Sequence, residues 1–512
     1  MMHGRAKSDP AIVARKPTNK AGQAAAESVE PRAGAKGNAG EPGTLWTQGQ
    51  ESAPPGLDRI RQAARKDRKR RFTALLHHVD IALLRASFRA LKRDAAPGVD
   101  GVTWQDYEAD LERKLADLHD RVHRGGPYHP QPSSRRYIAK ADGGRRPLAV
   151  AALEDKIVQR AVLEVLNAIY EEDFLEFSYG FRPGRSQHDG LDTLVVGIGS
   201  KKVNWILDAD IRSFFDSVSH VWLRRFLELR IGDKRILRLI AKWLKAGVLE
   251  DGVVTVSDTG TGQGSVISPL LANVYLHYVI DLWARRWSRR DAKGDMIMVR
   301  YADDLVFGFE HESEAERFQE AMRARLEAFA LTLHPDKTRR IEFGRHAAAN
   351  RERAGLGKPE TFTFLGFTFI CAKSRRGKFL IKRKSRRDRM QAKLAAVKAT
   401  LRQRMHQPIP VLGAWLRHVV QGYFNYHAVP TNFAAIAAFR HHVACLWLRA
   451  LRRRSNRDKT TWARMKQLAD DFLPTPRISH PWPEQRSAVT HPRREPYAGN
   501  PPVRFCAGGV QQ

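Results

Sequence analysis

The sequence predicts an α+β fold that is followed by a smaller, all-α and strongly basic domain. Strand-like and helical patterns alternate over residues 57–370. After residue 370 the strand patterns largely stop, and helical patterns follow a segment, residues 373–393, in which eleven of 21 residues are Lys or Arg. The chain of 512 residues has room for roughly two to four domains with a sizeable core.

Composition indicates a nucleic-acid partner. The chain has 88 Lys and Arg against 55 Asp and Glu, a formal net charge of +33, which is typical of proteins that hold a polyanion. No apolar run approaches the length of a membrane span, so we expect no membrane partner. Cys371, Cys445 and Cys506 lie far apart and form no CxxC pair, which excludes a disulfide-stapled fold and favours a reducing, cytoplasmic setting.

The N-terminal half is predicted to be mostly helical with one hairpin. Residues 1–56 are rich in Ala, Gly, Pro, Ser and Glu without a period, so we expect a disordered tail with no secretory signal. Hydrophobic periodicity and turn residues then predict a long basic helix and an amphipathic helix between residues 57 and 91, a helix near 105–123, a β-hairpin over 137–150 and a helix over 153–177.

The next segment alternates helices with strands. Residues 203–211 alternate as a strand, with Asp208 and Asp210 on one face. We then expect helices near 219–247 and 268–287 around a Gly/Thr/Ser-rich connection, a hairpin over 296–309, a helix over 312–331, strands at 339–343 and 361–370, helices at 388–405, 411–427 and 431–452, and an irregular tail over 471–512.

Acidic residues occur on two separate strand segments. Asp210 closes the first strand, and Asp303-Asp304 interrupts the apolar hairpin. Phosphoryl transfer to a 3′-hydroxyl uses two Mg²⁺ ions about 3.5 to 4 Å apart, which carboxylates from different strands can hold. An Asp-Asp pair alone is usually a turn, but its apolar surroundings make unpaired charge costly unless a cation neutralises it. Asp208 rivals Asp210, because it shares the same face.

Ordered motifs around these acids resemble those of group II intron-encoded reverse transcriptases. Tyr301-Ala-Asp-Asp304 matches the reverse transcriptase signature and follows Asp210-Ile-Arg-Ser-Phe-Phe-Asp216 and Gly262-Gln-Gly-Ser-Val-Ile-Ser-Pro in the family's order. Further matching blocks lie at residues 97–101, 136–148, 177–186, 333–338 and 364–367, so the similarity covers residues 60–470. The chain departs from the family at Gly262 and Ala139, where Pro is usual, which loosens two loops but removes no functional side chain.

The resemblance implies a right-hand polymerase, with fingers and palm over residues 57–370 and a helical thumb or maturase domain over 375–470. Residues 412–426 and 446–454 are similar to the maturase segment of the family. No cysteine pair follows residue 454, so we expect a member without the Cys/His-rich endonuclease domain, like the bacterial class C type.

The resemblance also implies the site residues. Asp210 and Asp303 would bind two Mg²⁺ ions with Asp304 in support. Its spacing of five residues after Asp210 makes Phe215 the residue that excludes a 2′-hydroxyl, with a core phenylalanine as the alternative. The remaining assignments are Lys140 and Arg146 for the triphosphate, Gln263 and Gly264 for close backbone approach to nucleotide and template, Lys337 as general acid for pyrophosphate, and Arg452, Arg453 and Arg454 for RNA. The alternative for Lys140 and Arg146 is a solvated basic hairpin. The alternative for Lys337 is an ordinary surface lysine, and for the three arginines it is a solvated helix face.

The predicted function is RNA-directed DNA synthesis together with binding of group II intron RNA, which assists splicing and intron mobility. The expected partners are intron RNA, an RNA template with a DNA primer, deoxynucleoside triphosphates and target DNA. The alternatives are a reverse transcriptase of another kind (retron, defence or diversity-generating) and an RNA chaperone without polymerase activity. The maturase-like segment argues against the first, and the intact acidic triad argues against the second. An unrelated basic structural protein does not explain so many ordered motifs.

Overall fold

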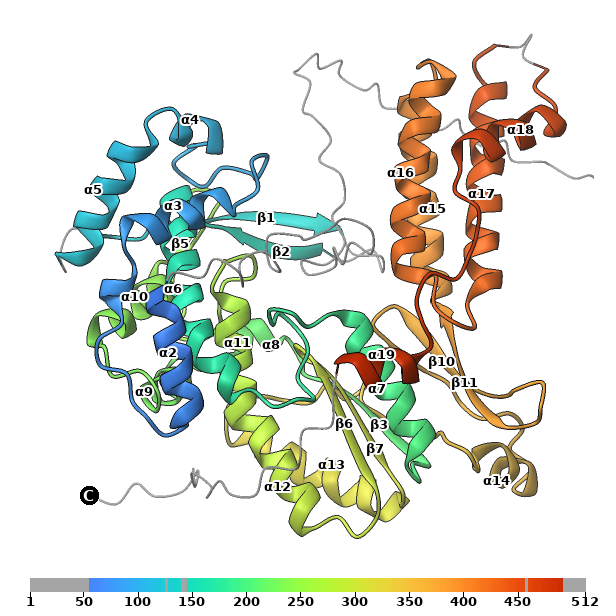
Figure 1. Cartoon of the computed structure of the whole chain (residues 1–512), viewed down its shortest axis with the longest axis horizontal. Coiled ribbons are helices and arrows are strands. Elements are labelled where there is room, and N and C mark those ends of the chain that lie inside the picture. The colour runs from blue at the N-terminus through green and yellow to red at the C-terminus, as the bar shows by residue number, and fades with distance from the viewer. Residues whose placement is uncertain (1–54, 125–127, 140–144, 456–458, 491–512) are drawn as a thin grey trace, which may run out of the picture.

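The computed structural model describes residues 55–124, 128–139, 145–455 and 459–490, so the predicted N-terminal tail lies almost wholly outside the described residues. Figure 1 shows three parts: the N-terminal helices with a small sheet, a central sheet with helices on it, and a bundle of long helices on the opposite side from the N-terminal helices. The mixed helix and sheet content agrees with the predicted α+β class.

The N-terminal helices pack around α6 (Leu153–Asp173), most of which is buried. They are α2 (Pro55–Lys66), η1 (Leu76–His78), α3 (Ile81–Arg89), α4 (Trp104–Glu108) and α5 (Leu111–His123). The expected basic helix is present as α2 but ends at Lys66, so it is shorter than predicted. At the start of η1 the carboxylate of Asp233 accepts hydrogen bonds from the backbone N–H groups of Leu75 and Leu76 (2.8 and 3.0 Å), which satisfies two backbone donors of that turn.

The first sheet has the order β2-β1-β4-β5. The predicted hairpin is confirmed as β1 (Ser133–Ala139) and β2 (Arg145–Val150), although its turn lies outside the described residues. The strands β4 (Val248–Glu250) and β5 (Val253–Thr255) were not predicted. They follow α9 (His220–Glu228) and α10 (Lys234–Lys245), which replace the single expected helix.

The central sheet is antiparallel, with the order β6-β7-β3-β8, and both of its faces are buried. Its strands are β6 (Met296–Tyr301), β7 (Asp304–Phe309), β3 (Trp205–Asp210) and β8 (Arg339–Glu342). Leu207 packs into the core that contains α11 (Ser268–Leu276), the π-helical η2 (His277–Asp281), α12 (Leu282–Arg290) and α13 (Glu312–Glu327). Ile206 faces the other core, beneath α7 (Gln187–Ser200). The predicted strand and hairpin are thus confirmed.

Strands continue beyond residue 370, where the sequence predicted that they stop. The third sheet consists of β9 (Phe362–Phe364), β10 (Phe367–Lys373) and β11 (Phe379–Ser385), and it follows α14 (Ala347–Arg353). The basic residues of β11 conceal its pattern, since Ile381, Arg383 and Ser385 are buried while Lys382 and Lys384 are exposed. The first part of the basic run is therefore in a hairpin, and the prediction that the domain over residues 375–470 is all-α is wrong at β11.

The predicted basic helices form a bundle with its own core. They are α15 (Arg387–Gln403), α16 (Ile409–His427) and α17 (Phe433–Arg452), joined by α18 (Trp462–Phe472). The expectation of an irregular tail is wrong for α19 (Pro483–Thr490), which packs on α7 in Figure 1. Arg486 of α19 contacts Asp192 of α7 at 3.2 Å, and Arg383 of β11 pairs with the same carboxylate. Within the described ranges, no helix is long and apolar enough to cross a membrane.

Candidate active site

The three predicted catalytic aspartates meet at one edge of the central sheet. Asp210 ends β3, Asp304 begins β7, and the two are register partners in the antiparallel pair. Asp303 lies in the turn between β6 and β7, directly after Ala302, whose φ of 56° is in the left-handed region. Pairing of β3 with β7 therefore brings together carboxylates that are more than ninety residues apart in sequence.

Asp208 lies behind this edge and has a different environment. The pKa of Asp208 is raised to about 7, chiefly by burial; the guanidinium of Arg339, its register partner on β8, opposes the shift, and the carboxylates of Asp304 and Asp210 contribute to it. The side chain of Asp210 is 27% exposed and can contact a ligand at this edge. The crowding of negative charge at this edge favours a bound cation.

Lys337 reaches the same edge. Its Nζ lies 3.1 Å from Oδ2 of Asp210. The segment that carries it is anchored on the end of β3, because the N–H of His334 donates to the carbonyl of Asp210 at 2.8 Å and Leu333 forms a bridge with Ile211. The side chain of Lys337 is 63% exposed, so it can contact a ligand that enters the site.

The donor set suits magnesium. Among the residues that the structure describes, no three His, Cys, Asp or Glu side chains converge as a preformed metal cage. Mg²⁺ seldom uses such a cage, since one or two carboxylates, water and substrate phosphates usually complete its octahedral shell. Asp210 and Asp303 supply carboxylates of that kind, and the ammonium of Lys337 occupies a position where positive charge is already favoured.

Phe215 follows this strand on α8 (Phe214–Ser217) and is largely buried. It is 9% exposed, belongs to the main core and meets Phe214 edge to face, with ring centroids 5.4 Å apart. Its carbonyl accepts a hydrogen bond from the N–H of Thr261 at 2.7 Å, which ties α8 to the loop that carries Gln263. Both readings of Phe215, sugar contact and core residue, are compatible with this position.

The loop with Gln263 and Gly264 packs against β2. Gly264 has a φ of 106°, and a Cβ there would lie 2.7 Å from the carbonyl oxygen of Ala149. The carbonyl of Gln263 accepts a hydrogen bond from the N–H of Ala149, and buried Gln159 of α6 accepts from Ser265 and Val266. Gly264 therefore permits a close backbone approach, although the neighbour seen here is β2 itself.

The two predicted triphosphate-binding residues, Lys140 and Arg146, belong to the β1–β2 hairpin region. Lys140 lies outside the described residues. Arg146 lies on β2 opposite Ile138, on the strand that holds the Gln263 loop, but its side chain is not described.

The three predicted RNA-binding arginines lie on the helical bundle, apart from the acidic edge. Arg452 and Arg453 are exposed, and Arg452 donates from Nε to the carbonyl of Thr460 at 2.9 Å. Arg454 is half-buried and donates to the carbonyl of Gln407 at 2.8 Å, so it also joins α17 to the loop before α16. Arg452 and Arg453 are the better candidates for RNA contact.

Arg300 and Asp281, which are not among the predicted site residues, lie fully buried behind the Asp303 turn. A signal was present, because an arginine inside an otherwise apolar strand needs a buried partner. No pattern indicated which acid pairs with it.

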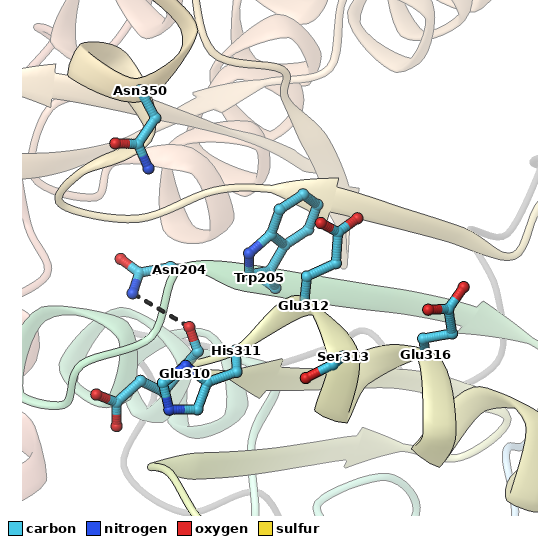
Figure 2. Close-up of a pocket in the computed structure, with 8 residues that line it drawn as sticks. All are labelled: Asn204, Trp205, Glu310, His311, Glu312, Ser313, Glu316 and Asn350. Atoms are coloured by element: carbon cyan, nitrogen blue, oxygen red, sulfur yellow. Dashed lines mark hydrogen bonds between the residues drawn. The ribbon is translucent and has the colours of Figure 1, made fainter.

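A pocket of 530 Å³ lies at the other end of β3 (Figure 2). It is lined by Trp205, the first residue of β3, and by three glutamates, of which Glu312 and Glu316 contact Arg340 at 3.6 and 3.3 Å. At about 3.3 Å per residue along a strand, it lies some 17 Å from Asp210. The pocket is therefore separate from the acidic edge.

Comparisons with known proteins agree with these motifs. Residues 138–369 match the family described as "Reverse transcriptase (RNA-dependent DNA polymerase)". The chain is 33% identical over 315 residues to protein YkfC of Escherichia coli, covering 56% of this chain and 78% of that protein. It is 35% identical over 225 residues to group II intron-encoded protein LtrA of Lactococcus lactis (43% and 37% covered), and 40% identical over 172 residues to a 91 kDa protein in the cob intron of Schizosaccharomyces pombe (34% and 21%). The chain thus spans well under half of the last two relatives.

Proposed function

Because the chain belongs to the family of group II intron-encoded reverse transcriptases, we propose that the acidic edge of the central sheet is its catalytic centre. Membership makes the chain an RNA-directed DNA polymerase that depends on a divalent metal and has a role in intron splicing. The observation that carries the assignment is the register of β3 and β7, which pairs Asp210 with Asp304 beside the Asp303 turn.

Asp210 and Asp303 hold two Mg²⁺ ions in this proposal, and Asp304 supports them. Bound ions of this kind activate the 3′-hydroxyl and stabilise charge on the transferred phosphoryl group. Asp210 and Asp303 orient the primer end and the nucleotide toward each other. The contact between Lys337 and Asp210 supports a role in which Lys337 donates a proton to the departing pyrophosphate as the new phosphodiester bond forms.

The remaining nucleotide contacts follow the same arrangement. Phe215 limits the space for a 2′-hydroxyl on the incoming sugar, and Lys140 and Arg146 bind the triphosphate, Lys as a point charge and Arg as a fork. Gln263 and Gly264 pass close to the nucleotide and template. The contact of Gln263 with Ala149 supports this placement, since it joins their loop to the strand that carries Arg146.

The parts of the molecule correspond to those of a right-hand polymerase in this proposal. The central sheet is the palm, the β1–β2 sheet with the N-terminal helices is the fingers, and the helices of residues 387–472 are the thumb or maturase domain. The separate hydrophobic core of the bundle supports treating it as a unit of its own.

The bundle also binds structured intron RNA, which it holds through phosphate contacts that favour the splicing-competent fold. The exposure of Arg452 and Arg453 and the basic surface of β11 and α15 support this role. Target DNA is the remaining partner in this proposal. A reverse transcriptase with a role outside introns is the alternative, which the intron-related names of the relatives disfavour.

Two assays on the purified chain test the proposal. The first follows extension of a DNA primer on an RNA template with Mg²⁺, and the second follows splicing of a group II intron RNA at low Mg²⁺ with and without protein. We expect extension that chelation of the metal abolishes, and faster splicing with protein. Extension without any effect on group II introns would leave the polymerase assignment standing and remove the maturase role.

A further inference from the structure

Arg300 is completely buried three residues before Asp303. It lies on β6 and is 1% exposed. All three nitrogens of its guanidinium are engaged. Nε and Nη2 donate to the two carboxylate oxygens of Asp281 (2.7 and 2.6 Å), Nη2 donates to the hydroxyl of Ser178 (2.6 Å), and Nη1 donates to the side-chain oxygen of Asn273 (2.9 Å) and to the carbonyl of Ala302 (3.1 Å).

These partners come from three different segments. Ser178 belongs to the loop after α6, Asn273 lies on α11, and Asp281 ends the π-helical turn η2, a geometry that is frequent at functional sites. Backbone hydrogen bonds join the first segment to the strand, since the N–H of Arg300 donates to Phe177 and its carbonyl accepts from Tyr179, both at 2.8 Å. The guanidinium thus links the turn that carries Asp303 to α11 and to η2.

The hydrogen bond from Arg300 reaches a turn whose backbone conformation is unfavourable at Ala302. Ala302 is buried and has a φ of 56°, a conformation that costs an alanine energy and persists only where the surroundings enforce it. Asn273 donates to the carbonyl of Gly180 at 2.7 Å, and a Cβ at Gly180 would lie 2.3 Å from the nitrogen of Ala302. Packing by Gly180 on one side and the hydrogen bond from Arg300 on the other therefore hold Ala302.

We propose that the buried Arg300–Asp281 pair, with Asn273 and Ser178, positions the carboxylate of Asp303 relative to that of Asp210. Arg300 and Asp281 touch no substrate and act through the Ala302 carbonyl and the turn. A buried ion pair adds little net stability compared with apolar residues, so its presence here is better explained by the orientation that it imposes. This inference rests on the proposed role of Asp303 as a metal ligand.

The test separates positioning from stability. Arg300→Lys keeps the charge beside Asp281 but loses the fork that also reaches Ala302. The double variant Asp281→Asn/Arg300→Gln removes both charges, so no unpaired charge stays buried. The matched control is Asp173→Asn/Arg230→Gln, which neutralises a second buried pair, 2.8 Å apart with side chains 8% and 3% exposed, where Arg230 donates to the carbonyls of Asp67 and Arg70.

Each protein is measured for thermal midpoint and for kcat, nucleotide KM and Mg²⁺ dependence of primer extension. We expect Arg300→Lys and the Asp281/Arg300 double variant to lose up to about 100-fold in kcat, the effect of a misplaced catalytic group, and to need more Mg²⁺ for half-maximal rate. Nucleotide KM should change little. The control should melt at a similarly lowered temperature and keep the Mg²⁺ dependence of the wild type.

Two results would overturn the inference while the polymerase assignment stands. One is wild-type Mg²⁺ dependence and kcat in a folded Asp281/Arg300 double variant, with Asp303→Ala inactive. The other is an equal change in the Asp173/Arg230 control, which would mean that both pairs act only through stability. If Asp303→Ala itself extends primers normally, the proposed site is wrong, and the two failures are thereby distinguished.

Discussion

Asp210 lies directly opposite Asp304 in the antiparallel pair of β3 and β7, and the ammonium of Lys337 lies 3.1 Å from Oδ2 of Asp210. Negative charge from two strands and one nearby cation thus share a single edge of the central sheet. Substitution of each residue at this edge should therefore have its own effect on primer extension.

Removal of either proposed metal ligand should abolish polymerisation. Asp210→Ala and Asp303→Ala should each lower the rate of primer extension about a thousandfold or more, because several kcal/mol of charge stabilisation is lost at about 1.4 kcal/mol per tenfold change. Asp208→Ala, which removes a carboxyl with a raised pKa behind the edge, should cost far less. If Asp210→Ala kept the wild-type rate and Asp208→Ala lost most of it, Asp208 would be the metal ligand in place of Asp210.

Lys337→Met should slow the chemical step without weakening nucleotide binding. We expect kcat to fall by about 100-fold, as for loss of a general acid, and nucleotide KM to change little. Single-turnover incorporation over a range of pH measures the effect. Lys358→Met removes an exposed lysine elsewhere and serves as the control. An unchanged kcat would make Lys337 an ordinary surface lysine.

Phe215→Ala tests sugar selection against a core role. If the ring excludes a 2′-hydroxyl, the ratio of kcat/KM for deoxynucleotide over ribonucleotide should fall by about 10- to 200-fold, or roughly 1 to 3 kcal/mol. Phe214→Ala is the matched control, since Phe214 is buried beside it at 2% exposure. Both variants should be destabilised by about 3 kcal/mol or more. A core role alone predicts the same nucleotide ratio in both.

Splicing assistance should be separable from polymerisation. Asp303→Ala should make no cDNA yet support splicing of the cognate intron at low Mg²⁺, because RNA binding uses phosphate contacts rather than the carboxylates. Arg452→Glu/Arg453→Glu should weaken RNA binding and flatten its salt dependence by roughly one unit of slope for each phosphate that the protein no longer neutralises. Arg454 is left intact, because it is half-buried and its hydrogen bond to Gln407 joins α17 to the loop before α16, whereas Arg452 and Arg453 are exposed. Because Arg452 also donates to the carbonyl of Thr460, the thermal midpoint of the variant is measured as well.

The control for this charge reversal is Arg289→Glu/Arg290→Glu, a pair of exposed arginines at the end of α12. It changes net charge by the same amount on a different part of the molecule. Equal loss of RNA affinity in both double variants would assign binding to overall charge. Parallel loss of splicing and polymerisation in folded Asp303→Ala would contradict separate functions.

Stability should fall in mild acid through His188. Burial, followed by His480 and the guanidinium groups of Arg486 and Arg383, holds the pKa of His188 well below its usual value, and the ring stacks on His480 at 4.0 Å. The unfolded chain gains a proton as the pH drops below about 6.5 while the native ring stays neutral, so up to about 1.4 kcal/mol is lost per pH unit.

His188→Phe keeps a ring in place and removes the titration, so its thermal midpoint should fall less between about pH 7.5 and pH 5.5 than that of the wild type. His442→Phe, at an exposed position on α17, is the control and should leave the pH dependence unchanged. The same slope in His188→Phe and wild type would assign acid sensitivity to other groups, such as His427, whose pKa burial lowers to about 3.

Local sequence patterns were sufficient to predict several elements. The alternation around Asp208 and Asp210 predicted β3, the apolar halves around Asp303 predicted the β6–β7 hairpin, and helical periodicity predicted α15, α16 and α17. Each signal lies within about one element's length of sequence, because side chains repeat every 2 or 3.6 residues whatever the rest of the chain does. Ordered motifs then carried the candidate catalytic residues.

Features that depend on distant partners became apparent only in the folded chain. The carboxylate of Asp233, over 150 residues away, bonds the backbone N–H groups of Leu75 and Leu76 at the start of η1. The basic residues of β11 predict an exposed segment, but Arg383 is buried, where it pairs with Asp192. The partners of Arg300 likewise have no periodic signature. Burial makes such pairings obligatory, since a buried charge or N–H must find a partner, but it leaves the choice of partner to the folded chain.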